Sequence, residues 1–343
     1  MSIPEVQRWL IKKRLDAAIF KPLGEDPDPT IQYLIGYDGH GVLRIPAKGE
    51  PILFVYSLEE NRAKKIFKNT VVSRDPFKEA LKGRRLGLEV RRWTVPEFKL
   101  HKLSGRVVDL TPEVRVLRAI KSKKEINKLS FVAKQTSKIF EDLLKQWKNF
   151  KTESDVAAWI DYQIKKRGGE PSFPTIVASG KNAAMPHYTP QRKKLQRGFC
   201  VLDFGMKYQG YCADMTRTIF IGKPKEQDCK YYGKVFAAQE AAYQKIKSDT
   251  PTKTLHEIAI TTLGDDAKYF IHALGHGIGL EVHESPRVSM NAEDILKENM
   301  IITLEPGIYI PNRLGIRIED MFLVTKNGSK KLTTAPRRMI CVK

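Results

Sequence analysis

Four acidic residues interrupt apolar, strand-like segments of this sequence. They are Asp203 in the segment 198–204, Asp214 in 211–221, Glu305 in 301–310 and Glu319 in 315–324. Aspartate is disfavoured in β-strands, and a half-buried carboxylate costs several kcal/mol unless something positive compensates it. The two aspartates stand in the strands of an expected hairpin that turns near residues 208–210. One such acid would be an ordinary hydrogen-bond acceptor, but four of them predict a shared, positively charged partner.

A segment rich in histidine and glycine, residues 272–286, lies between the two acidic pairs. It contains His276 and His283, and imidazoles are natural metal ligands and proton carriers. Its glycines allow the backbone to approach a site closely. In the last segment Arg317 and Glu319 are two residues apart, so they are expected on the same face of a strand. We therefore expect these side chains at the same site as the other acids.

Charge balance suggests what such a site would bind. Four carboxylates in one core carry a charge of −4, which two divalent cations would offset. Carboxylates with one imidazole form an oxygen-rich ligand set, suited to Mn²⁺, Co²⁺, Fe²⁺ or Zn²⁺ in pairs about 3–4 Å apart. The alternative is four separately hydrogen-bonded acids and a core histidine, each needing its own explanation. A two-metal hydrolase is the favoured interpretation.

Four segments together resemble one known family. They read LDFG…ADMTRT, GHGIGLEVHESP, LEPGIYIP and GIRIED, and they include all the acids named above. The sequence is similar to the pita-bread metallopeptidases (family M24), which include methionine aminopeptidase, Xaa-Pro aminopeptidase and Xaa-Pro dipeptidase (prolidase). The resemblance implies a ligand set in chain order: Asp203 on one metal, Asp214 bridging, His276 and Glu305 on the other metal, and Glu319 bridging.

The same resemblance implies further roles. His187 matches a histidine that binds substrate and stabilises the transition state, and His283 matches one that contacts the scissile carbonyl oxygen. His272 and Arg317 match positions that shape the proline side of the site. Glu305 is expected to carry a proton to the leaving nitrogen as well as to bind metal. The remaining histidines match no family position and are expected at the surface or in packing: His40, His101 and His256.

The elements that must position this site fall into two groups, with an expected boundary near Ile120. Residues 1–120 alternate helices and strands and predict a smaller α/β domain with a mixed sheet, like that of creatinase relatives. Residues 121–343 are expected to form the pita-bread catalytic domain, so the fold class is α+β. Expected elements of the first domain are a helix at 6–14, strands at 17–20, 41–46, 52–55 and 85–90, an apolar segment at 31–34 and a helix opened by a capping box at Ser57.

The second domain begins with a capping box at Ser122–Glu125 that opens a long helix to about Trp147. Its apolar positions follow the helical period. Other expected helices are 152–167, 228–247 and 255–263, and other expected strands are 175–178, 198–204, 211–221, 272–274, 301–310 and 315–324.

Composition limits the remaining possibilities. The formal charge of +21 invites a nucleic-acid interpretation, but the lysines are spread along the chain without an RNA-binding motif or a zinc finger. Four cysteines without CxxC spacing are expected as reduced core thiols. No apolar run reaches the roughly 18 residues of a membrane span, and no signal peptide is evident. The protein is expected in the cytoplasm.

Within the family, an N-terminal domain argues against methionine aminopeptidase, and the complete ligand set argues against the metal-free creatinase relatives. Hydrolysis of Xaa-Pro dipeptides is favoured, with an Xaa-Pro aminopeptidase acting on longer peptides as the alternative. A pita-bread protein that binds nucleic acid without catalysis is the remote alternative. The resemblance also implies a homodimer.

Overall fold

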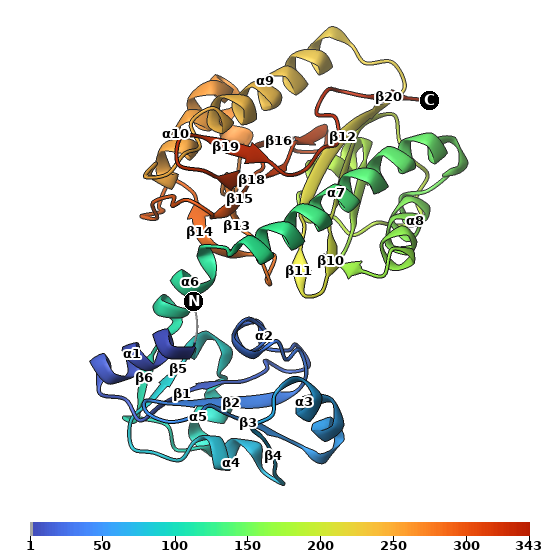
Figure 1. Cartoon of the computed structure of the whole chain (residues 1–343). Coiled ribbons are helices and arrows are strands. Elements are labelled where there is room, and N and C mark those ends of the chain that lie inside the picture. The colour runs from blue at the N-terminus through green and yellow to red at the C-terminus, as the bar shows by residue number, and fades with distance from the viewer. Residues whose placement is uncertain (1–2) are drawn as a thin grey trace. The chain divides into compact units, whose positions relative to one another are not determined.

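The computed structural model describes residues 3–343, so the first two residues of the expected N-terminal domain lie outside it. The chain divides into two compact units, Met1–Arg118 and Ala119–Lys343, and both combine helices with β-sheet (Figure 1). This agrees with the predicted α+β class. No helix among the described residues is long and apolar enough to cross a membrane.

A six-stranded mixed sheet in the order β4-β3-β2-β1-β5-β6 forms the centre of the first unit. The central strand β1 pairs antiparallel with β2 and parallel with β5. The strands are β1 (Ala17–Phe20), β2 (Gly41–Pro46), β3 (Ile52–Val55), β4 (Thr70–Val72), β5 (Leu86–Leu88) and β6 (Val107–Asp109). The helices are α1 (Ile3–Lys13), α2 (Pro29–Ile35), α3 (Glu60–Ile66), α4 (Pro76–Ala80), α5 (Val95–Leu100) and α6 (Thr111–Ala119), with 3-10 turns η1 (Ser57–Glu59) and η2 (Val90–Arg92).

Both faces of this sheet are buried. Ala18 and Phe20 of β1 pack in one apolar core, while Ala17 and Ile19 pack in another. Successive side chains of a strand point to opposite faces, so the two cores lie on opposite sides of the sheet. This explains why every residue of β1 is apolar, whereas a strand with one solvent-exposed face would alternate apolar and polar residues.

One local expectation for the first unit, the capping box at Ser57, was wrong, and other features of this unit were not expected. The segment 31–34 is part of helix α2, because Asp28 accepts hydrogen bonds from the first backbone amides and Pro29 opens the helix. The expected capping box at Ser57 is a 3-10 turn, since the Glu60 carboxylate pairs with Lys64 instead. Strand β6 was not expected.

The second unit holds two larger sheets, β20-β12-β9-β8 and β14-β13-β15-β18-β19, with smaller sheets β11-β10-β7 and β16-β17. The strands are β7 (Glu170–Pro171), β8 (Ile176–Ser179), β9 (Gly198–Phe204), β10 (Met206–Tyr208), β11 (Tyr211–Cys212), β12 (Met215–Ile221), β13 (Gly275–Gly277), β14 (Glu284–Val288), β15 (Ile301–Leu304), β16 (Gly307–Ile310), β17 (Leu314–Arg317), β18 (Asp320–Val324), β19 (Ser329–Lys331) and β20 (Cys341–Val342). The helices are α7 (Lys123–Gln146), α8 (Glu153–Lys166), α9 (Glu226–Tyr243) and α10 (Thr252–Leu263), with 3-10 turns η3 (Trp147–Asn149), η4 (Gly180–Ala184) and η5 (Gly264–Tyr269).

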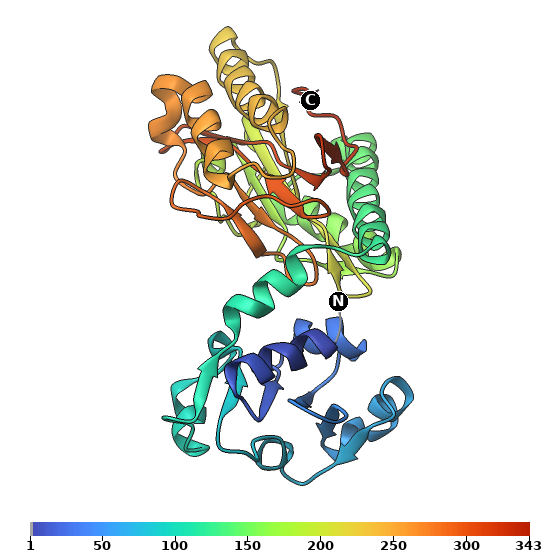
Figure 2. The same cartoon turned by 60° about the vertical axis from the view of Figure 1, so that its left-hand side comes forward.

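Helices cover these sheets from two sides. Figure 2 shows the strands between α7 and the pair α9–α10. One apolar core joins α7 and α8 to β9 and β12, and a second joins α9 and α10 to β15 and β18. Helix α7 begins at the predicted capping box, in which Ser122 and Glu125 bond each other's backbone amides. This arrangement agrees with the predicted pita-bread fold.

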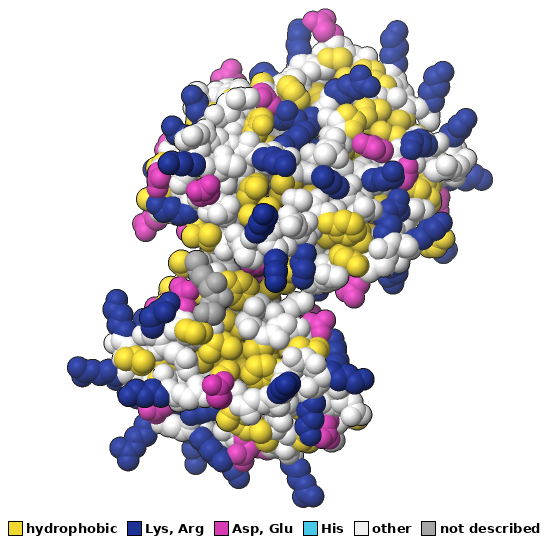
Figure 3. Space-filling model, viewed as in Figure 1, with side chains coloured by type: hydrophobic (Ala, Val, Ile, Leu, Met, Phe, Trp, Pro, Cys, Tyr) yellow, Lys and Arg dark blue, Asp and Glu magenta, His cyan; other side chains and the backbone are white. Residues whose placement is uncertain are grey.

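The surface bears on two expectations from composition. Lysines and arginines are spread over the visible face of each unit and do not gather in one patch (Figure 3). Cys200 and Cys212 are buried as expected, and burial raises the pKa of both thiols. Cys229 and Cys341 are exposed, so the expectation of core thiols was wrong for them.

Candidate metal centre

Three of the four anomalous acids lie where the chain passes from one sheet to another. Asp214 stands in the gap between β11 and β12, which pair with β10 and β9 respectively. Glu305 and Pro306 separate β15 from β16, and Glu319 separates β17 from β18. The expected continuous strands 211–221, 301–310 and 315–324 are therefore each interrupted, because their halves pair with different partners.

Asp203 is the one acid within a strand. It lies in β9 opposite Thr216 of β12, in an antiparallel pairing that runs without interruption from Gly198 to Phe204. The strand limits 198–204 agree with the expectation from sequence. The hairpin turn also lies where it was expected, with positive φ at Gln209 and Gly210 between β10 and β11.

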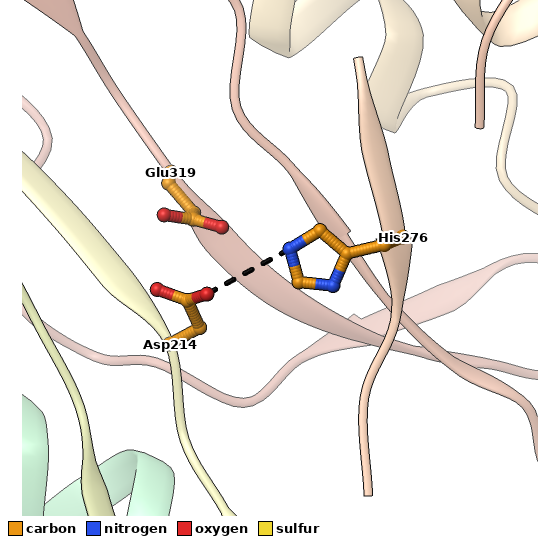
Figure 4. Close-up of side chains that lie close together, drawn as sticks. All are labelled: Asp214, His276 and Glu319. Carbon is orange, nitrogen blue, oxygen red and sulfur yellow. Dashed lines mark ion pairs between the residues drawn. The ribbon is translucent and has the colours of Figure 1, made fainter. Parts of the chain in front are cut away.

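Asp214, His276 and Glu319 converge on one point (Figure 4). One ligand atom from each lies within 4.8 Å of the others. The His276 ring extends from β13, and its Nε2 is 3.7 Å from Asp214 Oδ2 and 3.5 Å from Glu305 Oε1. Four of the five predicted ligands thus form one cluster around the His276 nitrogen.

Several carboxylate oxygens of the predicted ligands have no hydrogen-bond donor. Among the described residues, Asp203 Oδ1, Asp214 Oδ1 and Glu319 Oε1 are shielded from solvent and unpartnered. The other oxygens of two of these groups are bound, since Arg317 Nη2 donates to Asp203 Oδ2 at 2.6 Å and the Thr216 hydroxyl donates to Glu319 Oε2 at 2.8 Å. Buried acceptors are normally satisfied, so three among the predicted ligands call for an explanation.

The electrostatics of the cluster are unfavourable without a cation. Burial, together with the neighbouring Asp203, raises the pKa of Glu319 to about 8. Burial and the neighbouring Glu319 raise the pKa values of Asp214 and Glu305 well above their ordinary range. Burial and the nearby His283 ring lower the pKa of His276 to about 3, so its imidazole is neutral at pH 7. A neutral imidazole is the form that binds metal.

These residues fit a divalent metal site. A bound cation would accept the unpartnered oxygens and offset the repulsion among the acids. Three or more carboxylates with one neutral imidazole match the ligand preferences of first-row divalent ions. Arg317 already offsets one of the four negative charges through Asp203, which the charge count from sequence did not include.

Arg317 is the centre of a hydrogen-bond network behind the cluster. Its Nε donates to Thr216 Oγ1 at 3.0 Å and its Nη1 donates to Tyr309 OH at 2.6 Å, in addition to the bond to Asp203. Thr216 therefore joins Arg317 to Glu319, which places the two side chains on the same side as their spacing predicted. Each guanidinium nitrogen has a protein partner, and the predicted contact of Arg317 with substrate stays a prediction.

Sequence reasoning missed Tyr309 and Thr216. The Tyr309 hydroxyl lies 2.9 Å from His272 Nε2 as well as against Arg317, and the side chain is almost fully buried. A signal for Tyr309 was present, because a buried tyrosine hydroxyl needs a polar partner and this one stands in an apolar run beside Glu305. Thr216 lies in a run of residues that suit any strand, and it carried no comparable signal.

Three further histidines stand beside the cluster. Burial and the positive charge of Arg317 lower the pKa of His272 to about 4, with a smaller contribution from His187. Partial burial of its ring and the nearby His187 also lower the pKa of His283, whose ring centre lies 4.4 Å from that of His276. His187 and His283 are exposed while His276 is buried, so predicted substrate-binding imidazoles face solvent at the edge of a buried ligand cluster.

Comparison with known proteins agrees with this geometry. Residues 127–326 match metallopeptidase family M24, and the chain belongs to that family. An Xaa-Pro dipeptidase of Pyrococcus horikoshii is 36% identical over 99% of this chain and 98% of its own length. The Xaa-Pro dipeptidase of Pyrococcus furiosus is 38% identical over 85% of this chain and 86% of its own length.

Solved structures give the same family and two named activities. The crystal structure of the prolidase from Pyrococcus horikoshii matches with a TM-score of 0.89 and 35% identity, over 98% of this chain and 99% of that one. The X-Pro aminopeptidase of Thermotoga maritima also matches with a TM-score of 0.89, at 30% identity over the whole of both chains. The chain is therefore a metallopeptidase with the fold of proline-directed enzymes.

Proposed function

We propose that this chain hydrolyses the peptide bond preceding proline, with Xaa-Pro dipeptides as its main substrates. The observation that carries the proposal is the cluster of buried acids with unpartnered oxygens around a neutral imidazole. The relatives named Xaa-Pro dipeptidase support the choice of substrate. The catalytic domain would be residues 121–343, with residues 1–120 as the smaller N-terminal domain, and the active form would be a homodimer.

The cluster would hold two divalent ions, with Mn²⁺, Co²⁺, Fe²⁺ and Zn²⁺ as the candidates. The proposed ligands are Asp203, Asp214, His276, Glu305 and Glu319. Such ions supply Lewis acidity and activate water for attack on a carbonyl. Arg317 and Thr216 would hold the carboxylates of Asp203 and Glu319 in place through the bonds described above.

The protein's own groups would bind the peptide and move the proton. His283 has a lowered pKa, so at neutral pH it is an uncharged imidazole whose N–H can donate to the scissile carbonyl oxygen. His187 would bind the substrate beside it, and His272 would contact the proline side. Glu305 would accept a proton at one carboxylate oxygen and deliver it to the leaving proline nitrogen.

The test is hydrolysis of Ala-Pro and Met-Pro by the purified protein loaded with each candidate metal in turn. We expect activity that is lost on chelation and restored by metal, and Asp214→Ala should abolish it. Full activity in protein shown to be free of metal would contradict the proposal.

A second candidate is an Xaa-Pro aminopeptidase that acts on longer peptides. The match to the Thermotoga maritima X-Pro aminopeptidase over the whole of both chains favours it. Rates on Xaa-Pro and Xaa-Pro-Yaa substrates with the same first residue separate the two. Faster cleavage of the tripeptide would reverse our choice.

A further inference from the structure

A fully buried carboxylate outside the metal cluster has no assigned role. Glu153 is the first residue of α8 and is 0% exposed. Its Oε1 accepts hydrogen bonds from the Ser179 amide and hydroxyl, both at 2.9 Å, and from Asn182 Nδ2 at 2.8 Å. Its Oε2 accepts from the Tyr188 hydroxyl at 2.7 Å. Both oxygens are therefore satisfied, and by donors from one short stretch of chain.

That stretch carries His187. Ser179 is the last residue of β8, Asn182 lies in η4, and Tyr188 directly follows His187. Asn182 Nδ2 also donates to the Tyr188 hydroxyl at 2.9 Å, which closes the network. The two ends of segment 179–188 are thus fixed to the same carboxylate.

The opposite side of the same segment meets the residues behind the metal cluster. The Pro186 carbonyl oxygen lies 3.5 Å from both terminal nitrogens of Arg317. A Cβ added at Gly315 of β17 would lie 1.7 Å from the Ala183 carbonyl oxygen, so the two backbones are in close contact. The segment is held between Glu153 on one side and β17 on the other, and His187 stands at its exposed turn.

We infer that Glu153 is a positioning residue for substrate binding, which acts by fixing segment 179–188 so that His187 stands correctly beside His272 and His283. This inference rests on the proposed function, in which His187 contacts the substrate. The position of a group relative to a reacting bond strongly affects rate, and a misplacement of about 1 Å can cost about 100-fold.

The chemistry of the pocket requires a carboxylate at position 153. All four hydrogen-bonding groups around it are donors, and the site at the start of α8 favours negative charge. In Glu153→Gln the side-chain amide would face the Tyr188 hydroxyl, which already accepts from Asn182, and the hydroxyl proton would lose its acceptor. Tyr188→Phe removes the same bond while leaving the carboxylate in place.

The experiment measures kcat and KM for Ala-Pro in metal-loaded Glu153→Gln and Tyr188→Phe, together with metal content. We expect kcat/KM to fall about 10- to 100-fold, with metal content unchanged. Glu125→Gln is the matched control, because Glu125 is also a buried helix-capping carboxylate but accepts its hydrogen bonds from the neighbouring Ser122, away from segment 179–188. Unchanged kinetics in Tyr188→Phe would overturn the inference, and this variant serves if Glu153→Gln fails to fold.

A double-mutant cycle with His187→Ala tests whether Glu153→Gln lowers kcat/KM through His187. If Glu153 acts through His187, Glu153→Gln should lower kcat/KM less than about twofold in the His187→Ala background. Effects that multiply would overturn the positioning role and leave the proposed function intact. Absence of metal-dependent Xaa-Pro hydrolysis in the unmodified protein would instead overturn the proposed function.

Discussion

Glu153 and Glu319 are both fully buried carboxylates in the second unit, but their surroundings differ. Every hydrogen-bond partner of the Glu153 carboxylate is a donor, and neither of its oxygens lacks a partner. Glu319 has one donor, Thr216, and its other oxygen has none, while Asp203 and Asp214 stand beside it. Burial of an acid is therefore not in itself a sign of a metal site. The sign is an unpartnered oxygen facing other acids.

The difference also separates two uses of buried charge. At Glu153 the donors surround the charge and the carboxylate organises a loop. Around Glu319 the protein leaves part of the charge uncompensated, which costs folding free energy unless a cation binds. Removing metal should leave the Glu153 site unchanged, whereas the Glu319 site should be stable only with metal bound.

The largest expected effect is the loss of activity in Glu319→Gln. Replacing a proposed metal-binding carboxylate by an amide should weaken metal binding and lower kcat/KM on the order of 1,000-fold, since metal-assisted hydrolysis rests on several kcal/mol of stabilisation. Kinetic assays with measured metal content check this. Glu125→Gln should keep full activity. If Glu319→Gln were active without bound metal, Glu319 would not differ from Glu153 in its need for a cation.

A second prediction concerns the pH dependence of the metal-free protein. The pKa of Glu319 rises from 4.5 to about 8 on folding, so between these pH values the folded protein holds a proton that the unfolded chain has lost. The free energy of unfolding therefore falls as the pH increases toward 8. His276 acts in the opposite sense, because its pKa falls from 6.5 to about 3 and its contribution is complete above pH 6.5. Between pH 6.5 and 8 the free energy of unfolding should therefore decrease, by about 2 kcal/mol from Glu319 alone.

Urea unfolding of chelated protein at several pH values in this window measures the effect. The decrease should be smaller in Glu319→Gln and absent in the metal-loaded protein, because a bound cation keeps the carboxylates ionised. A constant or rising free energy of unfolding in the chelated protein would show that the acids are compensated in some other way.

A smaller effect is expected at the network behind the cluster. Tyr309→Phe removes the hydroxyl that bonds Arg317 and His272, leaving buried Arg317 Nη1 with only the Pro186 carbonyl at 3.5 Å and half-buried His272 Nε2 without this partner. The cost of an unsatisfied buried group is about 1–3 kcal/mol, so kcat/KM should fall about tenfold while metal still binds. Tyr162→Phe, at an exposed tyrosine, is the matched control. Equal kinetics for the two variants would mean that Tyr309 does not support Arg317.

The buried acids could be recognised in the sequence because each one breaks a strong pattern. Asp203 in an apolar strand and Glu319 after Ile318 stand out against the strand period, and their burial follows from their neighbours. The strand breaks at Asp214, Glu305 and Glu319 could not be predicted in the same way, because they depend on which distant strand each half pairs with. A local pattern describes burial, whereas a change of sheet is a property of the whole fold.

Glu153 shows a second limit of sequence reasoning. At the start of a helix an acid is ordinary, since it favours the helix dipole and is usually exposed. Nothing local distinguishes it from Glu226 at the start of α9, which is exposed. Only the packing of segment 179–188 over the helix start makes Glu153 a buried acceptor.

The smallest expected effect concerns Glu125, a buried acid whose role is limited to capping its own helix. Ser122 caps α7, and its amide and hydroxyl both bond Glu125. Ser122→Ala removes the hydroxyl but keeps the amide, so the free energy of unfolding should fall by about 1 kcal/mol. Urea unfolding measures the loss, and kcat, KM and metal content should stay at the values of the unmodified protein. A change in KM would mean that the start of α7 is coupled to the site. Glu125 could then not be separated, as a purely structural acid, from Glu153 as a positioning acid.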